Sequence, residues 1–162
     1  MSTTQRLAVI AAAMAFSTHA HAELITHKDL SAGMALTMIQ TAMESCTAKG
    51  YRVSVAVIGR GTEVIAQVRG DGASPHTFEN SFRKAYTART FRVASGDIAK
   101  RFKDDPSYFA VRLANVIPAQ GALPIKVGDD VIGAIGVSGA PGGEKDEACA
   151  QSAIDKVAGE LK

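Results

Sequence analysis

The chain contains 162 residues, of which 46% are hydrophobic and 21% are charged, and its formal net charge is +2 at pH 7. This length suffices for one domain with a hydrophobic core. Because a net charge so close to zero creates no long-range field, the composition argues against nucleic acid as a partner.

The first 22 residues have the pattern of a secretory signal peptide. Arg6 supplies the positive charge, residues 7–16 form an apolar run, and the sequence AHA before Glu23 is a small-x-small cleavage site. The apolar run is shorter than the roughly 20 residues that cross a bilayer, so no stable membrane span is expected. We predict a signal peptide over residues 1–22, a mature domain over residues 23–162, and a periplasmic or secreted location.

The first half of the mature part predicts a helix followed by a hairpin. Apolar residues at i+4 spacing predict a helix over residues 27–49, which Gly50 ends. Residues 51–58 and 62–68 are rich in β-branched side chains and are separated by a Gly-Arg-Gly turn. They are therefore expected to pair as a β-hairpin.

The second half predicts helices, a second hairpin and a final helix. Ser74 followed by proline predicts the N-cap and first turn of a helix, which Ser95-Gly96 should interrupt before shorter helical pieces over 97–103 and 106–114. Two strands at 121–127 and 131–137 flank the turn Gly-Asp-Asp, and an amphipathic helix is expected over residues 143–161. Two hairpins imply antiparallel pairing. We predict a single α+β domain whose antiparallel sheet consists of two hairpins flanked by helices.

The mature part has two cysteines, Cys46 and Cys149, and each lies on a predicted apolar helix face. Export would favour a disulfide between them, whereas two buried free thiols are the alternative. No Cys-x-x-Cys spacing is present, so neither a zinc site nor a thioredoxin-like site is indicated.

The glycine-rich segment over residues 136–143 follows a strand and opens a helix, as phosphate-binding loops do. It lacks the Gly-Lys-Ser/Thr signature. Acids in the first turn of the helix, Glu144 and Asp146, would satisfy the helix dipole and repel phosphate. We interpret the segment as a structural loop, with a seam between subunits over residues 133–143 as an alternative role.

Basic and aromatic residues are interleaved between residues 78 and 103. A porphyrin with two propionates needs apolar surface beside fixed cations, and guanidinium groups suit carboxylates, although a solvated helix face is the usual meaning of such a run. The residues concerned are Phe78, Phe82, Tyr86 and Phe91, with Arg83, Lys84, Arg89, Arg92, Lys100, Arg101 and Lys103. For an iron ligand the side chains on offer include His27, His76 and Tyr86, and neither histidine has a second one at metal-ligand spacing.

Four motifs make the chain resemble the GlcG/HbpS family of haem-binding or haem-degrading domains. They are DGA at 71–73, KAYTA at 84–88, GAIGVSGA at 133–140 and PGGEKD at 141–146. The resemblance implies a small α+β domain that assembles into homo-oligomers, often octamers, and that binds haem or a similar flat anionic molecule. The chain departs from the family pattern at Gly70, where methionine is common, and at the turn 59–62, which lacks the usual acidic residue.

Carried over residue by residue, the resemblance places Lys84, Tyr86 and Thr87 along the ligand pocket, with Asp71 and Ser138 as fixed polar groups. Thr87 is the position to test first. No catalytic residue is implied. The candidate cofactor-binding residues are Thr87, Tyr86, Lys84, Asp71, Ser138 and Arg92, and the candidate iron ligands are Thr87, Tyr86 and His76.

Three functions remain in competition at this point. The first is a periplasmic or secreted protein that binds haem to buffer, deliver or sense it. The second is an enzyme that degrades haem or a related small oxidised compound. The third is an oligomeric accessory module that binds a partner protein and no small ligand.

Overall fold

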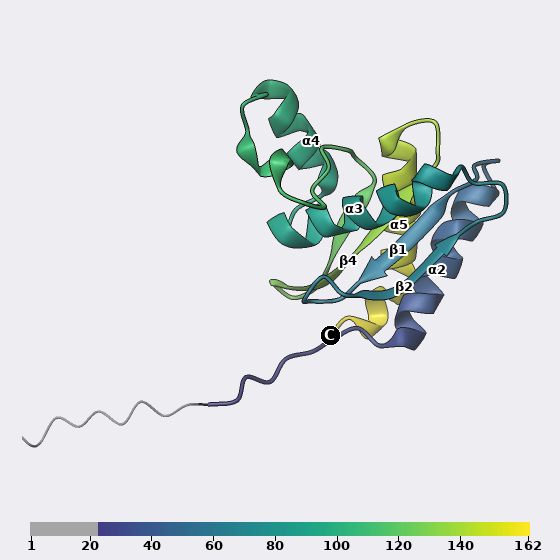
Figure 1. Cartoon of the computed structure of the whole chain (residues 1–162). Coiled ribbons are helices and arrows are strands. Elements are labelled where there is room, and N and C mark those ends of the chain that lie inside the picture. Colours follow the sequence, from purple (N-terminus) through teal and green to yellow (C-terminus); the bar gives the residue numbers. More distant parts are fainter. Residues whose placement is uncertain (1–22) are drawn as a thin grey trace, which may run out of the picture.

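A computed structural model describes residues 23–162, and the predicted signal peptide lies outside the described residues. One helix, a pair of strands, a group of helices, a second pair of strands and a last helix follow one another along the chain (Figure 1). In order, they are α2 (Ala32–Thr47), β1 (Ser54–Ile58), β2 (Val64–Arg69), α3 (Pro75–Phe91), α4 (Ser95–Asp104), η1 (Phe109–Arg112), β3 (Ala122–Val127), β4 (Asp130–Ser138), α5 (Gly143–Val157) and η2 (Ala158–Glu160).

The four strands form one antiparallel sheet with the order β2-β1-β4-β3. Both predicted hairpins are confirmed, since β1 pairs with β2 and β3 pairs with β4. The two hairpins join through β1 and β4, in a register that places Val57 opposite Ile135. The predicted α+β class with an antiparallel sheet built from two hairpins is therefore correct.

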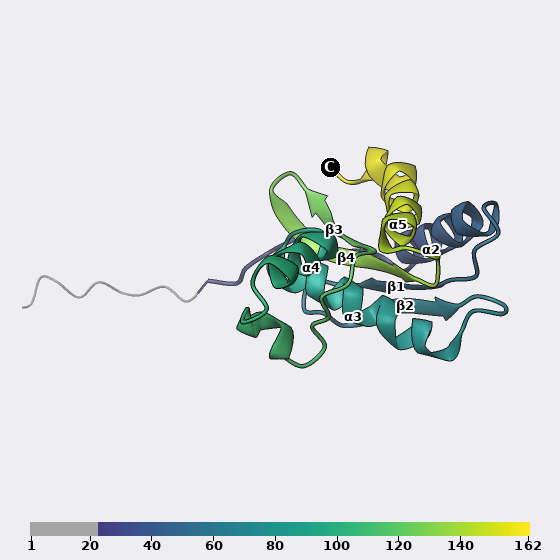
Figure 2. The same cartoon turned by 90° about the horizontal axis from the view of Figure 1, so that it is seen from above.

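Helices cover both faces of the sheet, as the view in Figure 2 shows. Alternate side chains of the central strands, such as Val57 and Ile135, pack with α2 and α5 in the larger part of the core. Their neighbours Ile58 and Ala134 face α3 on the opposite side. Because both faces are covered, β1 and most of β4 are buried, and their sequences read as nearly continuous apolar runs.

One glycine lets α3 lie close to the sheet. A Cβ atom on Gly136 would be 2.2 Å from the backbone oxygen of Ser81 and 2.8 Å from the backbone nitrogen of Ala85. Since both obstacles are helix backbone, no side-chain movement could make room for it. The glycines of β4 therefore serve packing within the chain, and the alternative of a subunit seam fails for β4, whose residues 131–138 are buried.

The first helix is shorter than predicted. We expected it to begin at residue 27, whereas α2 begins at Ala32, where the Ser31 side chain accepts a hydrogen bond of 3.1 Å from the backbone N–H of Met34. This cap satisfies one of the free N–H groups of the first turn and sets the start of the helix. The preceding residues 23–29 are exposed.

The interruption after α3 also differs from the prediction. Ser95 and Gly96 were expected to break the helix, but both lie inside α4, and the break is at Arg92. Arg92 adopts a left-handed conformation with φ of 59°. A left-handed residue is a common helix ending, usually served by glycine, so an arginine in this place gives no signal in the sequence.

The question left open for the cysteines is answered by the structure. Cys46 of α2 and Cys149 of α5 form a disulfide bond that joins the two helices on one face of the sheet. Within residues 23–162, no helix is long and apolar enough to span a membrane.

Candidate functional site

Two opposite flanks of α3 carry the candidate functional residues. His76, Asn80 and Lys84 recur at i+4 spacing and form what we call the polar flank. Phe78, Phe82 and Tyr86 have the same i+4 spacing two residues further along and, with Arg89, form what we call the aromatic flank. Because the two sets are offset by two residues, they lie on opposite sides of the helix, about 200° apart.

The polar flank forms one wall of a pocket of about 720 Å³. The pocket lies between α3, the segment after α2 and the glycine-rich loop that opens α5. Its lining residues are Gly50, Tyr51, Arg52, Gly72, Ser74, His76, Thr77, Asn80, Lys84, Ala119, Gln120, Ser138, Gly139, Ala140, Pro141, Gly143 and Asp146. Three of the predicted site residues, Lys84, Ser138 and His76, therefore meet in one place.

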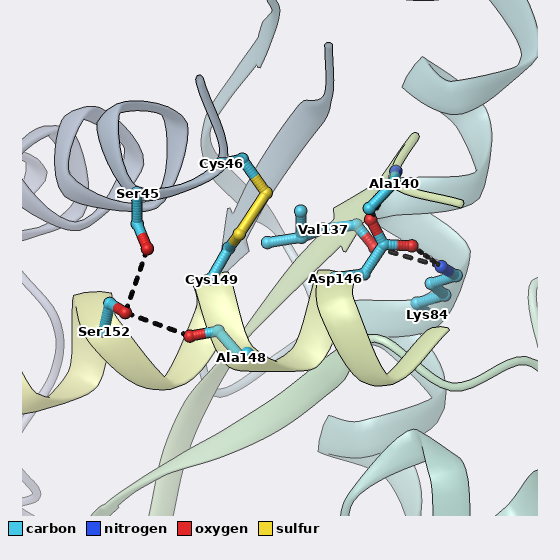
Figure 3. The surroundings of a disulfide bond; sticks show 9 residues. All are labelled: Ser45, Cys46, Lys84, Val137, Ala140, Asp146, Ala148, Cys149 and Ser152. Carbon is cyan, nitrogen blue, oxygen red and sulfur yellow. Dashed lines mark hydrogen bonds and ion pairs between the residues drawn. A yellow bond between two sulfur atoms is a disulfide. The ribbon is translucent and has the colours of Figure 1, made fainter. Parts of the chain in front are cut away.

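A buried ion pair lies at the base of this pocket. Lys84 and Asp146 are 5% and 2% exposed, and the Lys84 ammonium donates to Asp146 Oδ2 at 2.7 Å and to the backbone oxygen of Val137 at 3.1 Å. The second carboxylate oxygen of Asp146 accepts from the N–H of Ala140 at 2.9 Å. Figure 3 shows this pair bridging α3 and α5 beside the disulfide. The pair thus ties three elements together.

Burial raises the pKa of Asp146, and the charge and hydrogen bond of Lys84 act in the opposite direction. This carboxyl was expected to face the helix dipole and repel an anion from the loop. Instead it turns inward, and Lys84 neutralises it. That objection to an anion near the loop therefore does not apply to Asp146. Glu144 would still repel an anion at the loop, because its carboxylate lies directly beside Gly142.

Ser138 adds an unused hydrogen-bonding group to the pocket. It is the last residue of β4 and is only 5% exposed. Its hydroxyl makes no hydrogen bond to any residue between 23 and 162, and its oxygen is not among the enclosed side-chain atoms that lack a partner, so it is open to the pocket. Because Ser138 lines the pocket, its hydroxyl can bond to a molecule bound there.

Thr87 occupies a different environment. The residue is fully buried, and its hydroxyl accepts from the N–H of Ile117 at 2.9 Å and lies 2.8 Å from the backbone oxygen of Arg83, to which it donates. These bonds connect α3 to the segment before β3. The hydroxyl predicted as the first candidate for iron is thus engaged with the backbone in this chain.

The remaining predicted residues are spread over the surface. Asp71 is exposed in a neighbouring pocket of about 380 Å³, which shares Tyr51 and Arg52 with the larger one. Arg92 is exposed at the end of α3 and lines a groove beside β3 and α5. His76 is exposed at the rim of the polar-flank pocket. The structure therefore does not bring all six cofactor candidates together.

The aromatic flank faces the β1–β2 side of the sheet. Phe82 and Tyr86 are half-buried against the cluster around Ile58, and their ring centroids are 6.0 Å apart. Phe78 is 41% exposed, and Val64, which pairs with Ile58, is 47% exposed. An apolar strip thus reaches the surface along this side of α3.

Arg89 completes the aromatic flank with an unsatisfied guanidinium group. Its Nε atom is enclosed and has no hydrogen-bond partner among the described residues. Burial, and then the charges of Arg92 and Arg60, lower the pKa of Arg89. The charges of Asp130 and Glu63 act in the opposite direction, and an anion bound beside Arg89 would further offset the repulsion and supply an acceptor for Nε.

Several pocket residues were missed by the sequence reasoning. Asp146 was interpreted only as a helix-start acid, and Arg52 and Asn80 were not singled out. The i+4 spacing of Asn80 and Lys84 was visible in the sequence, but which flank would face the loop was not. Within residues 23–162, no group of three His, Cys, Asp or Glu side chains is placed to hold a metal ion.

Comparison with known proteins identifies relatives over most of the chain. A family model described as "Haem degrading protein HbpS-like" matches residues 30–155. The chain is also similar to an uncharacterised 15.0 kDa protein from the dhaT-dhaS intergenic region of Citrobacter freundii. The two are 29% identical over 119 residues, which cover 69% of this chain and 83% of that protein.

Solved structures share the fold. A double mutant of HbpS from Streptomyces reticuli superimposes with a TM-score of 0.80 at 29% identity, over 85% of this chain and 92% of that one. The PduOC–haem complex has a TM-score of 0.72 at 21% identity, over 79% and 94% of the two chains. The second likeness concerns the fold alone. The resemblance read from the four motifs is thereby confirmed.

Proposed function

Because the chain belongs to the HbpS-like family of haem-degrading proteins, we propose that it is a haem-binding protein of the periplasm or the extracellular space. The observation that carries the proposal is the aromatic flank of α3, where an apolar strip ends at Arg89, whose enclosed Nε atom has no acceptor among the described residues. A role in buffering, delivery or sensing would follow from binding without turnover.

The residues of the aromatic flank fit haem in chemical type. The apolar strip of Phe78, Phe82 and Val64 offers surface to a macrocycle, and Arg89 with Arg92 offers cations to two propionates. Tyr86 brings a phenol to the same flank, and tyrosine is a known haem ligand. Haem would supply the redox chemistry of its iron, while this chain would orient and partly shield it.

We expect the purified mature protein to bind haemin saturably, with a Soret shift at about one haem per chain. Tyr86→Phe should change the position of the Soret band, because it removes the phenol oxygen. Arg89→Gln should weaken binding about tenfold, because a hydrogen bond to a charged group contributes about 1.5–3 kcal/mol. An absorbance titration of each variant measures both effects.

Tyr108→Phe, on the loop beyond α4, is the matched control and should bind as the parent does. Thr87→Ala and His76→Ala complete the series of candidate ligands. The proposal fails if the parent gives no saturable Soret shift. A parent-like titration of Tyr86→Phe, together with loss of binding in His76→Ala, would move the iron to the opposite flank.

Export is part of the proposal and rests on the signal-like residues 1–22. The disulfide between Cys46 and Cys149 supports it, because such bonds persist in oxidising compartments. We expect the protein expressed in a bacterial host to begin at Glu23 when isolated from the periplasm or medium. Intact-mass measurement checks this, and an unprocessed chain confined to the cytoplasm would contradict it.

Degradation of haem is the second candidate function, because the family description names it. It differs from storage in requiring turnover with a reductant. Incubating the haem complex with ascorbate in the presence of catalase, which removes peroxide, should bleach the Soret band only if the protein acts as an enzyme.

Self-association is proposed for the exposed side of α2. Leu36 is 56% exposed and lines an apolar hollow of about 590 Å³ with Ile39 and Met43. Apolar surface of this kind is typical of contacts between subunits. Light scattering coupled to size exclusion should report a homo-oligomer, with the octamers of the family as one expected size, and Leu36→Glu should reduce its mass.

A further inference from the structure

The polar-flank pocket has chemistry that the haem proposal does not use. We propose that it is a separate binding site for an organic monocarboxylate, whose carboxylate is held by Lys84 and Ser138. This inference does not rest on haem binding, because the aromatic flank is on the other side of α3.

Hydrogen-bond donors that the chain does not use lie at the base of the pocket. A lysine ammonium has three N–H donors, and Lys84 uses two of them on Asp146 and Val137. Its third N–H and the unpartnered hydroxyl of Ser138 both belong to groups that are 5% exposed and line the pocket. Because both groups keep a donor that no residue of the chain uses, the base of the pocket is suited to an oxygen acceptor.

The carboxylate at the base of the pocket already has hydrogen-bond donors. Both oxygens of Asp146 are taken, one by Lys84 and one by the N–H of Ala140. The carboxylate at the base is therefore not free to recognise a cation or a donor. At the rim, Arg52 and Asn80 add further N–H donors. The lining thus favours a ligand that accepts hydrogen bonds.

The lining of the pocket carries a small net positive charge. Among the residues that line the pocket, Arg52 and Lys84 are positive and Asp146 is negative, which leaves one positive charge. A monoanion balances it. A phosphate dianion would exceed it and would also meet Glu144, whose carboxylate lies beside Gly142 at the start of α5. The charge therefore selects a carboxylate over a phosphate.

The walls of the pocket leave room for an apolar body on the ligand. Tyr51, Ala119, Ala140 and Pro141 provide apolar wall between the base and the solvent. A volume of about 720 Å³ is within the range of ligand pockets and exceeds what a bare acetate needs. The ligand class is accordingly a carboxylate with a compact apolar body.

The test uses the disulfide-bonded mature protein without haem and three probes, benzoate, its neutral analogue benzamide, and inorganic phosphate. We expect benzoate to give saturable amide shifts at residues 138–146 in ¹H–¹⁵N spectra and benzamide to bind at least about tenfold more weakly. Ser138→Ala should weaken benzoate binding about tenfold. Ser152→Ala, on α5 outside the lining of the pocket, is the matched control and should bind as the parent does.

Arg52→Gln is the second variant. Its side chain is at the exposed rim, so it should lower the affinity without altering the fold. The proposal is overturned if benzoate and benzamide bind equally, if phosphate binds and benzoate does not, or if Ser138→Ala retains parent affinity. It is also overturned if Ser138→Ala loses haem binding, since the pocket would then belong to the haem site. A failure of haemin to bind leaves the outcomes with benzoate, benzamide and phosphate readable, so this proposal and the haem proposal fail separately.

Discussion

Replacing Cys46 and Cys149 together by alanine is expected to lower the free energy of unfolding by about 2–5 kcal/mol. The bond closes a loop of 103 residues between α2 and α5, so its removal releases a large restriction on the unfolded chain. Both sulfurs are fully enclosed, and truncation to alanine would also leave a small cavity. Urea unfolding of parent and variant, followed by circular dichroism, measures the difference.

A second pair of residues between the same helices supplies the control. Ser45 and Ser152 bridge α2 and α5 with a hydrogen bond of 3.1 Å, as Figure 3 shows. Replacing both by alanine should cost only about 1 kcal/mol, because the net contribution of such a bond is small. Equal stability of the cysteine variant and the parent would contradict the stated role of the disulfide.

The disulfide also bears on the pocket. Cys149 is one turn after Asp146 on α5, and Cys46 is shortly before Gly50, Tyr51 and Arg52. The bond therefore holds two of the pocket's walls at a common point. Its loss is expected to weaken benzoate binding even at urea concentrations where the variant remains folded.

Lys84→Met is expected to lower the free energy of unfolding by about 3–5 kcal/mol at pH 7. The substitution leaves Asp146, which is 2% exposed, without its charged partner. Combining Asp146→Leu with Lys84→Met should recover most of the lost stability, because the double variant removes the second charge as well. Urea unfolding of Lys84→Met, Asp146→Leu and the double variant completes a double-mutant cycle for this pair.

The loss in Lys84→Met should depend on pH in a defined direction. Burial already raises the pKa of Asp146, and removing the lysine takes away the main opposing influence. A carboxyl whose folded pKa is raised contributes stability that is full below its unfolded pKa, about 3.9, and is lost as the pH rises through the folded pKa. The variant should therefore be closer to the parent at pH 4 than at pH 7.

The exposed Lys100→Met on α4 is the matched control for this series and should change stability by no more than about 0.5 kcal/mol. A Lys84→Met variant as stable as the parent at pH 7 would show that Asp146 is readily solvated. That result would contradict the conclusion that the base of the pocket is closed to solvent.

Local chemistry determined much of the fold in advance. The turn glycines and β-branched runs predicted both hairpins, and Ser74 with Pro75 predicted the start of α3. The motif from Gly133 to Asp146 predicted the family, which the HbpS-like match confirms. These features are encoded within a few neighbouring residues, so they can be read without knowing what packs against them.

The tertiary structure alone decided how distant residues meet. The pairing of β1 with β4, the bond between Cys46 and Cys149, and the contact of Lys84 with Asp146 each join segments more than 50 residues apart. The direction in which the flanks of α3 point follows from the same packing. A buried charge is stable only beside its partner. Its role therefore depends on a contact that helical spacing does not specify, and Asp146 could be recognised as part of the pocket only once the chain was folded.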